Sequence, residues 1–275
     1  MLHALREKVG DVIFKQAVKS YLEKHAFGNV ETADFISEVE VLCGKSLSEF
    51  VNLWIKNKAF PFEEAQRLLL KSPFIQEYEM VDCEAANSKC SYYLDSYVSD
   101  EAKIKIIQQK PELINSKTFN NSVKVRKAIA QVLATIPKHL KTDYESLLQD
   151  ASYVTIETAL YNLWSNFPEE RQVYLNQTEA MSLKNEATRI LWLVLVLSTP
   201  DFNQDEKPEY YEELVNFTSK DFNYEVRMSA FEYLLMLNAC NEVCELNLEA
   251  AKNHHNWRMS KFAKEQMELL KTNKN

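Results

Sequence analysis

Glycine scarcity is the feature that most constrains this chain, because only three glycines, Gly10, Gly28 and Gly44, occur in 275 residues. Sheet proteins and α/β enzymes need glycine for tight turns and for loops that bind phosphate. The apolar content of 46% and the charged content of 26% are typical of a folded globular protein. The composition therefore predicts an all-α fold with a substantial hydrophobic core.

The first sixty residues are expected to form a cluster of helices. Each of the three glycines follows an apolar stripe with helical spacing, so we expect Gly10, Gly28 and Gly44 to end helices in the left-handed conformation. Thr32 and Ser46 precede two further stripes and are the expected N-caps of the next two helices. This region, residues 1–60, is predicted to be a helical subdomain.

Residues 61–100 form the predicted linker between two parts of the chain. Pro61 and Pro73 interrupt the helical periodicity there. Only short helices are expected in this region, at about 62–71 and 84–97.

A repeat begins near residue 101 and predicts stacked antiparallel helical hairpins that resemble the HEAT family of repeats over residues 101–275. Its arginine and aspartate positions are expected to bridge neighbouring repeats, which is a structural role. The similar segments are Val125–Leu133, Val226–Phe231 and Trp257–Phe262, then Asp150–Tyr153 with Asp221–Tyr224, and the expected intervening helix Glu186–Leu197.

The charge distribution argues against two classes of partner. The formal net charge is −8, and no run of Lys or Arg provides the basic patch that nucleic acid or an anionic membrane surface would need. The longest apolar run, Ile190–Leu197, is far shorter than the roughly 20 residues of a membrane-spanning helix. We therefore expect no nucleic acid, no membrane span, and a buried helix at that run.

The five cysteines are odd in number and irregularly spaced, which favours free thiols in a reducing compartment and hence a cytoplasmic location. Cys240 and Cys244 with His254 and His255 could suggest a metal site, but their spacing fits no common structural zinc pattern, and small buried thiols are the favoured interpretation. A thiol nucleophile at Cys43 or Cys83 with a distant histidine is also disfavoured.

An ordered set of residues from Met1 to Pro61 is specific enough to indicate a family. The set is Met1-Leu2-His3-Ala4-Leu5-Arg6, Gly10-Asp11, Phe14, Tyr21-Leu22, His25, Phe27-Gly28-Asn29, Thr32, Asp34-Phe35, Glu40, Gly44-Lys45, Leu47, Phe50, Trp54 and Pro61. It resembles the end of the catalytic domain of the zinc aminopeptidases of the aminopeptidase N family. The resemblance implies that an all-helical C-terminal domain follows and covers the substrate cleft. Beyond Pro61 the chain resembles the family in architecture alone.

The chemistry of that family has no counterpart in these residues. Its H-E-x-x-H zinc motif and its Gly-x-Met-Glu-Asn strand do not occur in the sequence. No catalytic, cofactor-binding or metal-binding residue is therefore predicted in this chain, and zinc is implied only for a parent enzyme. The sequence leaves open whether the chain takes part in an enzyme, although alone it should be inactive.

The start of the chain bears on whether it belongs to a longer polypeptide. The helix expected at Met1–Leu5 has no Ser, Thr, Asp or Asn before it as a cap, which favours a piece of a longer polypeptide over a frayed native start. The expected partners are an upstream catalytic domain of the same polypeptide and, in the parent enzyme, a peptide substrate. The alternative is a stand-alone HEAT-like scaffold that binds a protein. A fragment should expose an apolar patch on its first helices, whereas a scaffold should present a polar cap.

Overall fold

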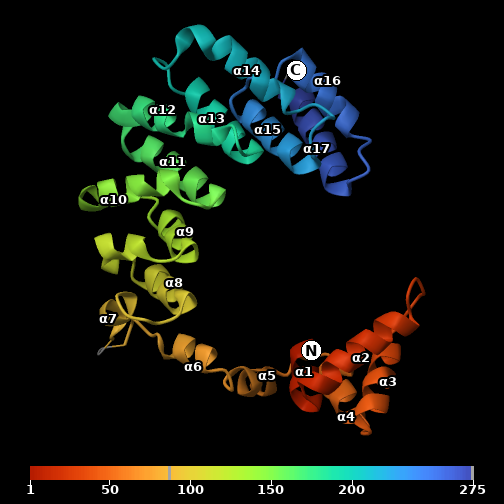
Figure 1. Cartoon of the computed structure of the whole chain (residues 1–275). Helices are drawn as coiled ribbons and strands as arrows, with labels where there is room; N and C mark the ends of the chain where they lie inside the picture. Colours follow the sequence, from red (N-terminus) through yellow and green to blue (C-terminus); the bar gives the residue numbers. More distant parts are fainter. Residues whose placement is uncertain (86–87, 274–275) are drawn as a thin grey trace. The chain divides into compact units, whose positions relative to one another are not determined.

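The computed structural model describes residues 1–85 and 88–273 of the chain. Within these ranges every regular element is a helix and there is no strand, which confirms the all-α prediction (Figure 1). The chain divides into two compact units, Met1–Val81 and Asp82–Asn275, which are named unit 1 and unit 2. No described helix combines the length and the apolar character needed to cross a membrane.

Unit 1 packs short helices around a small apolar core. Leu5, Ala17 and Val39 are fully buried there, and Leu47 and Phe50 complete the core from the next helix. The helices of unit 1 are α1 (Leu2–Val9), α2 (Asp11–Lys24), α3 (Thr32–Cys43), α4 (Ser48–Val51), which continues into the π-helical turn η1 (Asn52–Lys56), α5 (Phe62–Leu69) and α6 (Pro73–Met80).

Two of the three glycines have a positive φ angle, but only Gly44 has the predicted left-handed conformation, because Gly10 has an extended ψ of 157°. Gly10 has φ 83° between α1 and α2, and Gly44 has φ 65° in the left-handed conformation at the end of α3. The prediction for Gly28 is wrong, because Phe27 takes the positive φ angle of 61° one residue earlier. The Phe27 side chain is fully exposed, so its ring makes no packing contact that would account for this conformation.

The predicted N-caps are each displaced by one residue. The N-cap of α3 is Glu31 and not Thr32, and the Glu31 backbone N–H donates to the Asp34 carboxylate at 2.8 Å. Leu47, not Ser46, precedes α4, and its N–H donates to the Glu40 carboxylate at 2.6 Å. Acidic side chains thus satisfy these N–H groups from within α3, where the sequence pattern indicated Thr and Ser caps.

Unit 2 contains the remaining helices. A short helix was predicted at about 84–97, and the observed helix in that range is Cys90–Leu94. Residues 86–87 of the predicted range lie outside the described residues. The helices are α7 (Cys90–Leu94), α8 (Asp100–Gln109), α9 (Val123–Val132), α10 (Lys141–Glu145), α11 (Tyr153–Asn166), α12 (Arg171–Ser182), α13 (Glu186–Leu197), α14 (Lys207–Asn216), α15 (Tyr224–Met236), α16 (Glu242–Ala251) and α17 (Trp257–Asn273).

Unit 2 is built in two layers of helices. α9, α11, α13, α15 and α17 each contact the next and line the inner side of the curve that unit 2 follows, whereas α10, α12 and α14 lie on its outer side (Figure 1). α13 is the central element, and its residues Ile190–Val196 are all buried. The expected buried helix at Glu186–Leu197 is therefore confirmed with the predicted bounds.

Arginines recur at the same place on three inner helices. The inner helices begin at Val123, Tyr153, Glu186, Tyr224 and Trp257, and α9, α13 and α15 each carry an arginine in their first turn. Arg126 pairs with the buried Asp150 carboxylate before α11, and Arg189 binds Glu213 on α14 through two hydrogen bonds of 2.8 and 2.6 Å.

Arg126 thus links α9 to the segment before α11, and Arg189 links α13 to α14. Arg227 forms no such link, because its guanidinium donates to the Thr218 carbonyl at 3.0 Å within its own hairpin.

The prediction of free thiols is wrong for four of the five cysteines. Disulfides join Cys83 to Cys90 and Cys240 to Cys244, which leaves Cys43 free. The odd number of cysteines was not evidence for free thiols, because five cysteines can form two disulfides and leave one thiol unpaired. Disulfides persist mainly in oxidising compartments, so the cytoplasmic prediction loses its only basis.

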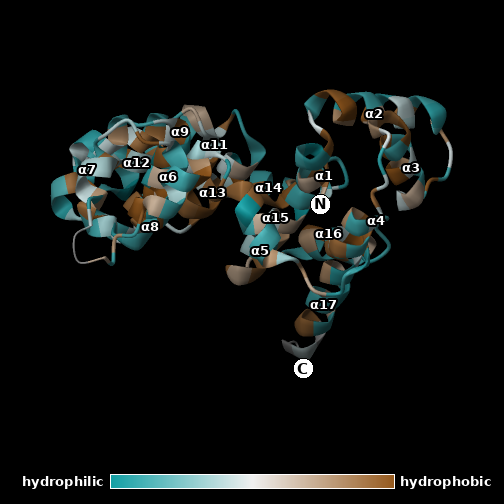
Figure 2. Ribbon diagram, turned by 90° about the horizontal axis from the view of Figure 1, so that it is seen from below, coloured by the Kyte–Doolittle hydropathy of each residue, from teal (hydrophilic) through white to brown (hydrophobic). Residues whose placement is uncertain are grey.

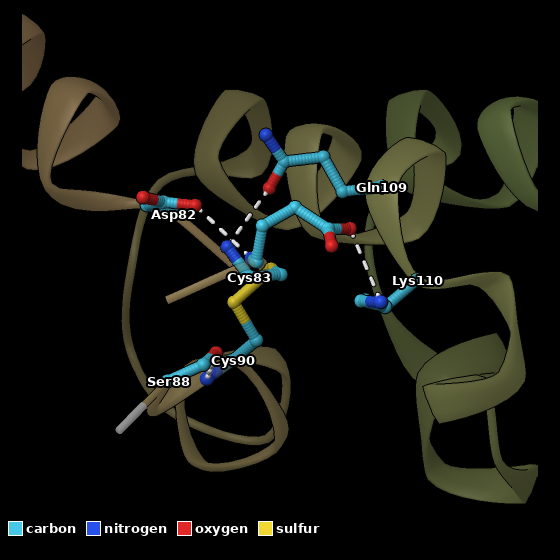
Figure 3. Close-up of a disulfide and its surroundings, with 7 residues drawn as sticks. Asp82, Cys83, Ser88, Cys90, Gln109 and Lys110 are labelled. Carbon is cyan, nitrogen blue, oxygen red and sulfur yellow. Dashed lines mark hydrogen bonds and ion pairs between the residues drawn. A yellow bond between two sulfur atoms is a disulfide. The ribbon is translucent and has the colours of Figure 1, made fainter. Parts of the chain in front are cut away.

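The Cys83–Cys90 disulfide lies near the start of unit 2, in a segment that hydrogen bonds to the end of α8 (Figure 3). The Cys83 N–H donates to the Gln109 side-chain carbonyl at 3.1 Å, and Lys110 pairs with Glu84 at 3.1 Å. Both sulfur-bearing residues are buried. The bond thus anchors the segment that covers the first long helix of the unit.

We expect Asp150→Ala to lower the free energy of unfolding of unit 2 by about 2–3 kcal/mol, because it leaves Arg126 without its buried carboxylate. Urea unfolding followed by circular dichroism measures this loss. Glu101→Ala is the matched control, since it removes the exposed Lys124–Glu101 ion pair and should leave the unfolding midpoint unchanged. Equal effects of the two substitutions would contradict the bridging role.

Alkylation of the unfolded, unreduced chain should label one cysteine, Cys43, whereas five should be labelled after reduction. Intact-mass spectrometry counts the labels, and peptide mapping places them. Five labels without reduction would restore the original free-thiol expectation and refute both disulfides.

Candidate functional site

The cysteine and histidine residues that could have suggested chemistry do not form a reactive site. Cys240 and Cys244 are bonded to each other, so neither supplies a thiolate to a metal. His254 and His255 stack with ring centroids 4.2 Å apart, and burial, followed by the nearby cations, lowers the pKa of His254. No group of three or more His, Cys, Asp or Glu in the described part of the chain could hold a metal ion.

Of the two cysteines considered as a thiol nucleophile, Cys43 and Cys83, only Cys43 has a free thiol. Cys83 is disulfide-bonded, and Cys43 lies at the end of α3 with its sulfur 3.4 Å from the Lys45 carbonyl oxygen.

An apolar groove opens on unit 1 between α1, α2 and α3. Its volume is about 430 Å³, and apolar stretches of α2 and α3 are visible in the hydropathy colouring of Figure 2. Phe14 and Tyr21 form one wall with Phe35, whose ring centroid lies 6.3 Å from that of Phe14 and 5.2 Å from that of Tyr21. The groove is lined by Met1, Leu2, Phe14, Val18, Tyr21, Leu22, Val30, Glu31, Thr32 and Phe35.

Several groove residues expose large apolar side chains. Leu22 is 63% exposed and Leu2 is 53% exposed, although both belong to helices whose other faces are buried. Exposed apolar patches are typical of surfaces that contact another protein, a membrane or a ligand. The first helices therefore present an apolar face where a terminal cap would be polar.

The inner side of unit 2 carries a second distinctive feature, centred on Glu157 of α11. The Thr188 hydroxyl at the start of α13 donates to Glu157 Oε1 at 2.7 Å. Burial raises the pKa of Glu157, while the Thr188 hydrogen bond partly offsets that effect. Glu157 is half-buried and makes no ion pair within the ranges that the structure covers.

Two tyrosines lie close to Glu157. Tyr161 stands one turn further along α11 and is 54% exposed, whereas Tyr233 of α15 is half-buried. Burial raises the pKa of Tyr233, and the charge of Glu157 raises it further.

These three residues were not singled out from the sequence. Glu157 and Tyr161 are spaced i, i+4, and Tyr161 lies outside the buried stripe of α11, which is a signal visible in the sequence. Nothing in the sequence pairs them with Tyr233, because that proximity depends on the stacking of α11, α13 and α15.

Comparison with known proteins places the chain beside aminopeptidases. It is 32% identical to aminopeptidase N of Lactococcus lactis subsp. lactis over 85 residues, which are 29% of this chain and 10% of that protein. It is 20% identical to tricorn protease-interacting factor F2 of Thermoplasma volcanium over 204 residues, or 71% of this chain and 26% of that protein. Aminopeptidase 2 of Candida albicans is 26% identical over 68 residues, which are 25% of this chain and 7% of that protein.

The matches support a relationship between this chain and the family that the first sixty residues resemble. The chain spans about a quarter or less of the length of these curated relatives. No family model matches the chain. No solved structure matches it either.

The unit 1 groove should bind an apolar dye from solution. We expect Leu22→Glu to reduce the fluorescence of bound anilinonaphthalene sulfonate by about half or more, because the new charge lies in the groove. Val41→Glu is the matched control, since Val41 is 75% exposed on α3 but does not line the groove. The same fluorescence loss in both variants would show that the dye does not report on the groove.

Proposed function

We propose that this chain is the non-catalytic, all-helical portion of a zinc-dependent aminopeptidase that removes N-terminal residues from peptides. One observation carries the proposal: two of the relatives that match are named aminopeptidases, yet the chain spans only about a tenth or less of their length. The helices of unit 2 would cover the substrate cleft of the intact enzyme with their inner side. That side carries the concave layer in which α9, α11, α13 and α15 follow one another.

Residues 1–60 are proposed to be the helical end of the catalytic domain, and residues 101–275 a HEAT-like domain, with residues 61–100 as the linker. The apolar groove of unit 1 supports this division, because a catalytic domain on the same polypeptide would cover it. Burying the exposed Leu22 side chain in such a contact would contribute up to about 2 kcal/mol.

Zinc in this proposal belongs to the catalytic domain. A catalytic zinc needs three protein ligands and an open position for water. Across residues 1–85 and 88–273, no cluster of His, Cys, Asp or Glu could provide such a ligand set. The residues of this chain do not fit the metal, so no step of peptide hydrolysis is assigned to them.

A stand-alone HEAT-like scaffold is the rival function. The repeated inner helices and the net charge of −8 would suit a protein that binds a basic partner. The apolar groove disfavours the rival, because a free solenoid end is normally polar.

The purified chain, supplied with zinc, should not hydrolyse aminoacyl-anilide substrates, because its described residues include no ligand set for the metal. Release of the chromogenic aniline measures the activity, and the chelator-treated chain is the control. Hydrolysis that the chelator abolishes would refute the non-catalytic role.

The coding sequence before Met1 separates the proposal from its rival. An in-frame H-E-x-x-H motif there supports the aminopeptidase, whereas a stop codon directly before Met1 supports the scaffold.

A further inference from the structure

Three segments of unit 2 carry the Asn-x-Ser/Thr sequence at which asparagine can accept an N-linked glycan. They begin at Asn120, Asn176 and Asn216, and none has proline at its middle position. The motif is short and also occurs by chance, so the sequence by itself does not establish a modification site. The structure adds three observations that bear on it, namely the state of the asparagine side chains, their place in the fold and the disulfides.

The asparagine side chains of the three motifs are not used by the fold. Asn120, Asn176 and Asn216 are exposed, and their side chains make no hydrogen bond with any other described residue. Other asparagines of unit 2 differ in this respect. Asn162 is buried and donates to the Ala130 carbonyl at 3.0 Å. A glycan on the amide nitrogen of the three exposed asparagines would therefore remove no hydrogen bond from the folded chain.

All three asparagines lie outside the inner layer of helices. Asn176 belongs to α12 and Asn216 is the last residue of α14, and both helices are on the outer side of unit 2 (Figure 1). Asn120 ends the 3-10 helix η3 (Ser116–Asn120), which contacts α9 and α10. N-linked glycans are bulky and hydrated, so they need a surface that no other part of the protein covers. The outer elements of unit 2 provide such positions.

The disulfides are an independent observation that points to the same modification. Cys83–Cys90 and Cys240–Cys244 are bonds of the kind that form in an oxidising compartment such as the lumen of the secretory pathway. N-linked glycosylation is a modification of secreted proteins. A chain that acquires both disulfides there is also exposed to the glycosylation machinery.

The hydroxyl groups of the motifs show when the modification must take place. Thr178 and Thr218 are fully buried and donate to backbone carbonyls, and Ser122 donates to the Asp100 carboxylate at 2.6 Å. A transferase that recognises the hydroxyl can reach Thr178 and Thr218 only before the helices pack. We therefore expect transfer to the nascent chain, after which folding leaves the modified asparagines on the surface.

We propose that Asn120, Asn176 and Asn216 carry N-linked oligosaccharides that are added in the secretory pathway. The donor is a lipid diphosphate-linked oligosaccharide. The asparagine Nδ2 forms a bond to the anomeric carbon of the terminal sugar, and the bond from that carbon to the diphosphate oxygen breaks. The lipid diphosphate leaves with the electron pair, Nδ2 loses one proton, and nothing is oxidised or reduced. The proposal is independent of the proposed function, because it depends only on exposure, sequence and disulfides.

Enzymatic deglycosylation followed by peptide mapping tests the proposal. The full chain is produced in cultured animal cells behind an added secretion signal and treated with peptide-N-glycosidase in water enriched in heavy oxygen. The enzyme converts each glycosylated asparagine to a heavy aspartate. We expect the label at Asn120, Asn176 and Asn216. Asn253 is the control for spontaneous deamidation, since it is exposed but has His255 two residues further on.

A pair of substitutions at Thr178 separates recognition of the motif from an effect on folding. Thr178→Ser keeps the hydroxyl and should keep the glycan on Asn176. Thr178→Val has nearly the shape of threonine without the hydroxyl, and it should abolish that glycan while the label at Asn120 and Asn216 remains. Asn176→Gln should give the same loss. Because the Asn176 side chain is exposed and unbonded, its removal should leave the unfolding midpoint of the deglycosylated chain unchanged.

Unlabelled motif peptides in a chain recovered from the secretory membranes with both disulfides formed would overturn the proposal, because such a chain has passed through the required compartment. Label at only some of the three asparagines would refute it for the others. The protein in an extract of its own source should also gain electrophoretic mobility after treatment with the glycosidase, and an unchanged mobility would overturn the proposal for the natural protein. The anilide assay reports catalysis alone, so failure of the proposed function is distinguishable from failure of these sites.

Discussion

The burial of α13 is the constraint on which the rest of unit 2 depends. Seven consecutive residues, Ile190–Val196, are buried, so this helix has no side that water can cover. A helix that is apolar on every side must be enclosed by neighbours. α11, α12, α14 and α15 supply that enclosure. Trp192 lies in its centre and donates its indole N–H to the Leu175 carbonyl at 2.9 Å. This hydrogen bond satisfies a polar group that would otherwise be buried without a partner.

The arginines of the inner layer neutralise carboxylates that become partly buried when the helices stack. Packing of successive hairpins brings carboxylates such as Asp150 and Glu213 into partly dry surroundings, where an unpaired charge is unfavourable. Arg126 and Arg189 neutralise them with ion pairs that link α9 to the segment before α11 and α13 to α14. Arg189 additionally lies over the ring of Trp192, with its guanidinium carbon 4.5 Å from the centroid. Polar and apolar contacts between hairpins are thus coupled through one side chain.

The local features of the fold could be predicted from the sequence, and the contacts between distant segments could not. Three glycines in the chain predicted helices throughout, and the apolar run at Ile190–Leu197 predicted a buried helix that the structure confirms. The positive φ angle of Phe27 was missed because bulky residues rarely adopt it. The Cys83–Cys90 disulfide was missed because cysteine counts do not determine which thiols meet. The hydrogen bond from Thr188 to Glu157 depends on the packing of α13 against α11, so no local pattern contains it.

Glu157 lies beside a position at which α11 departs from the arginine pattern of the other inner helices. In α9, α13 and α15 an arginine occupies the first turn, and Arg126 and Arg189 meet an acid of the next hairpin. α11 breaks the pattern with Ile156 and places an acid, Glu157, at the next position. A carboxylate kept half-buried without a counter-ion works against stability, and proteins tend to keep such groups where they serve a ligand. The departure from the repeat lies on the inner layer that the proposed function assigns to the peptide. Packing of the inner helices therefore accounts for the fold around α11, and the Glu157 carboxylate is held there by the Thr188 hydroxyl instead of by an arginine.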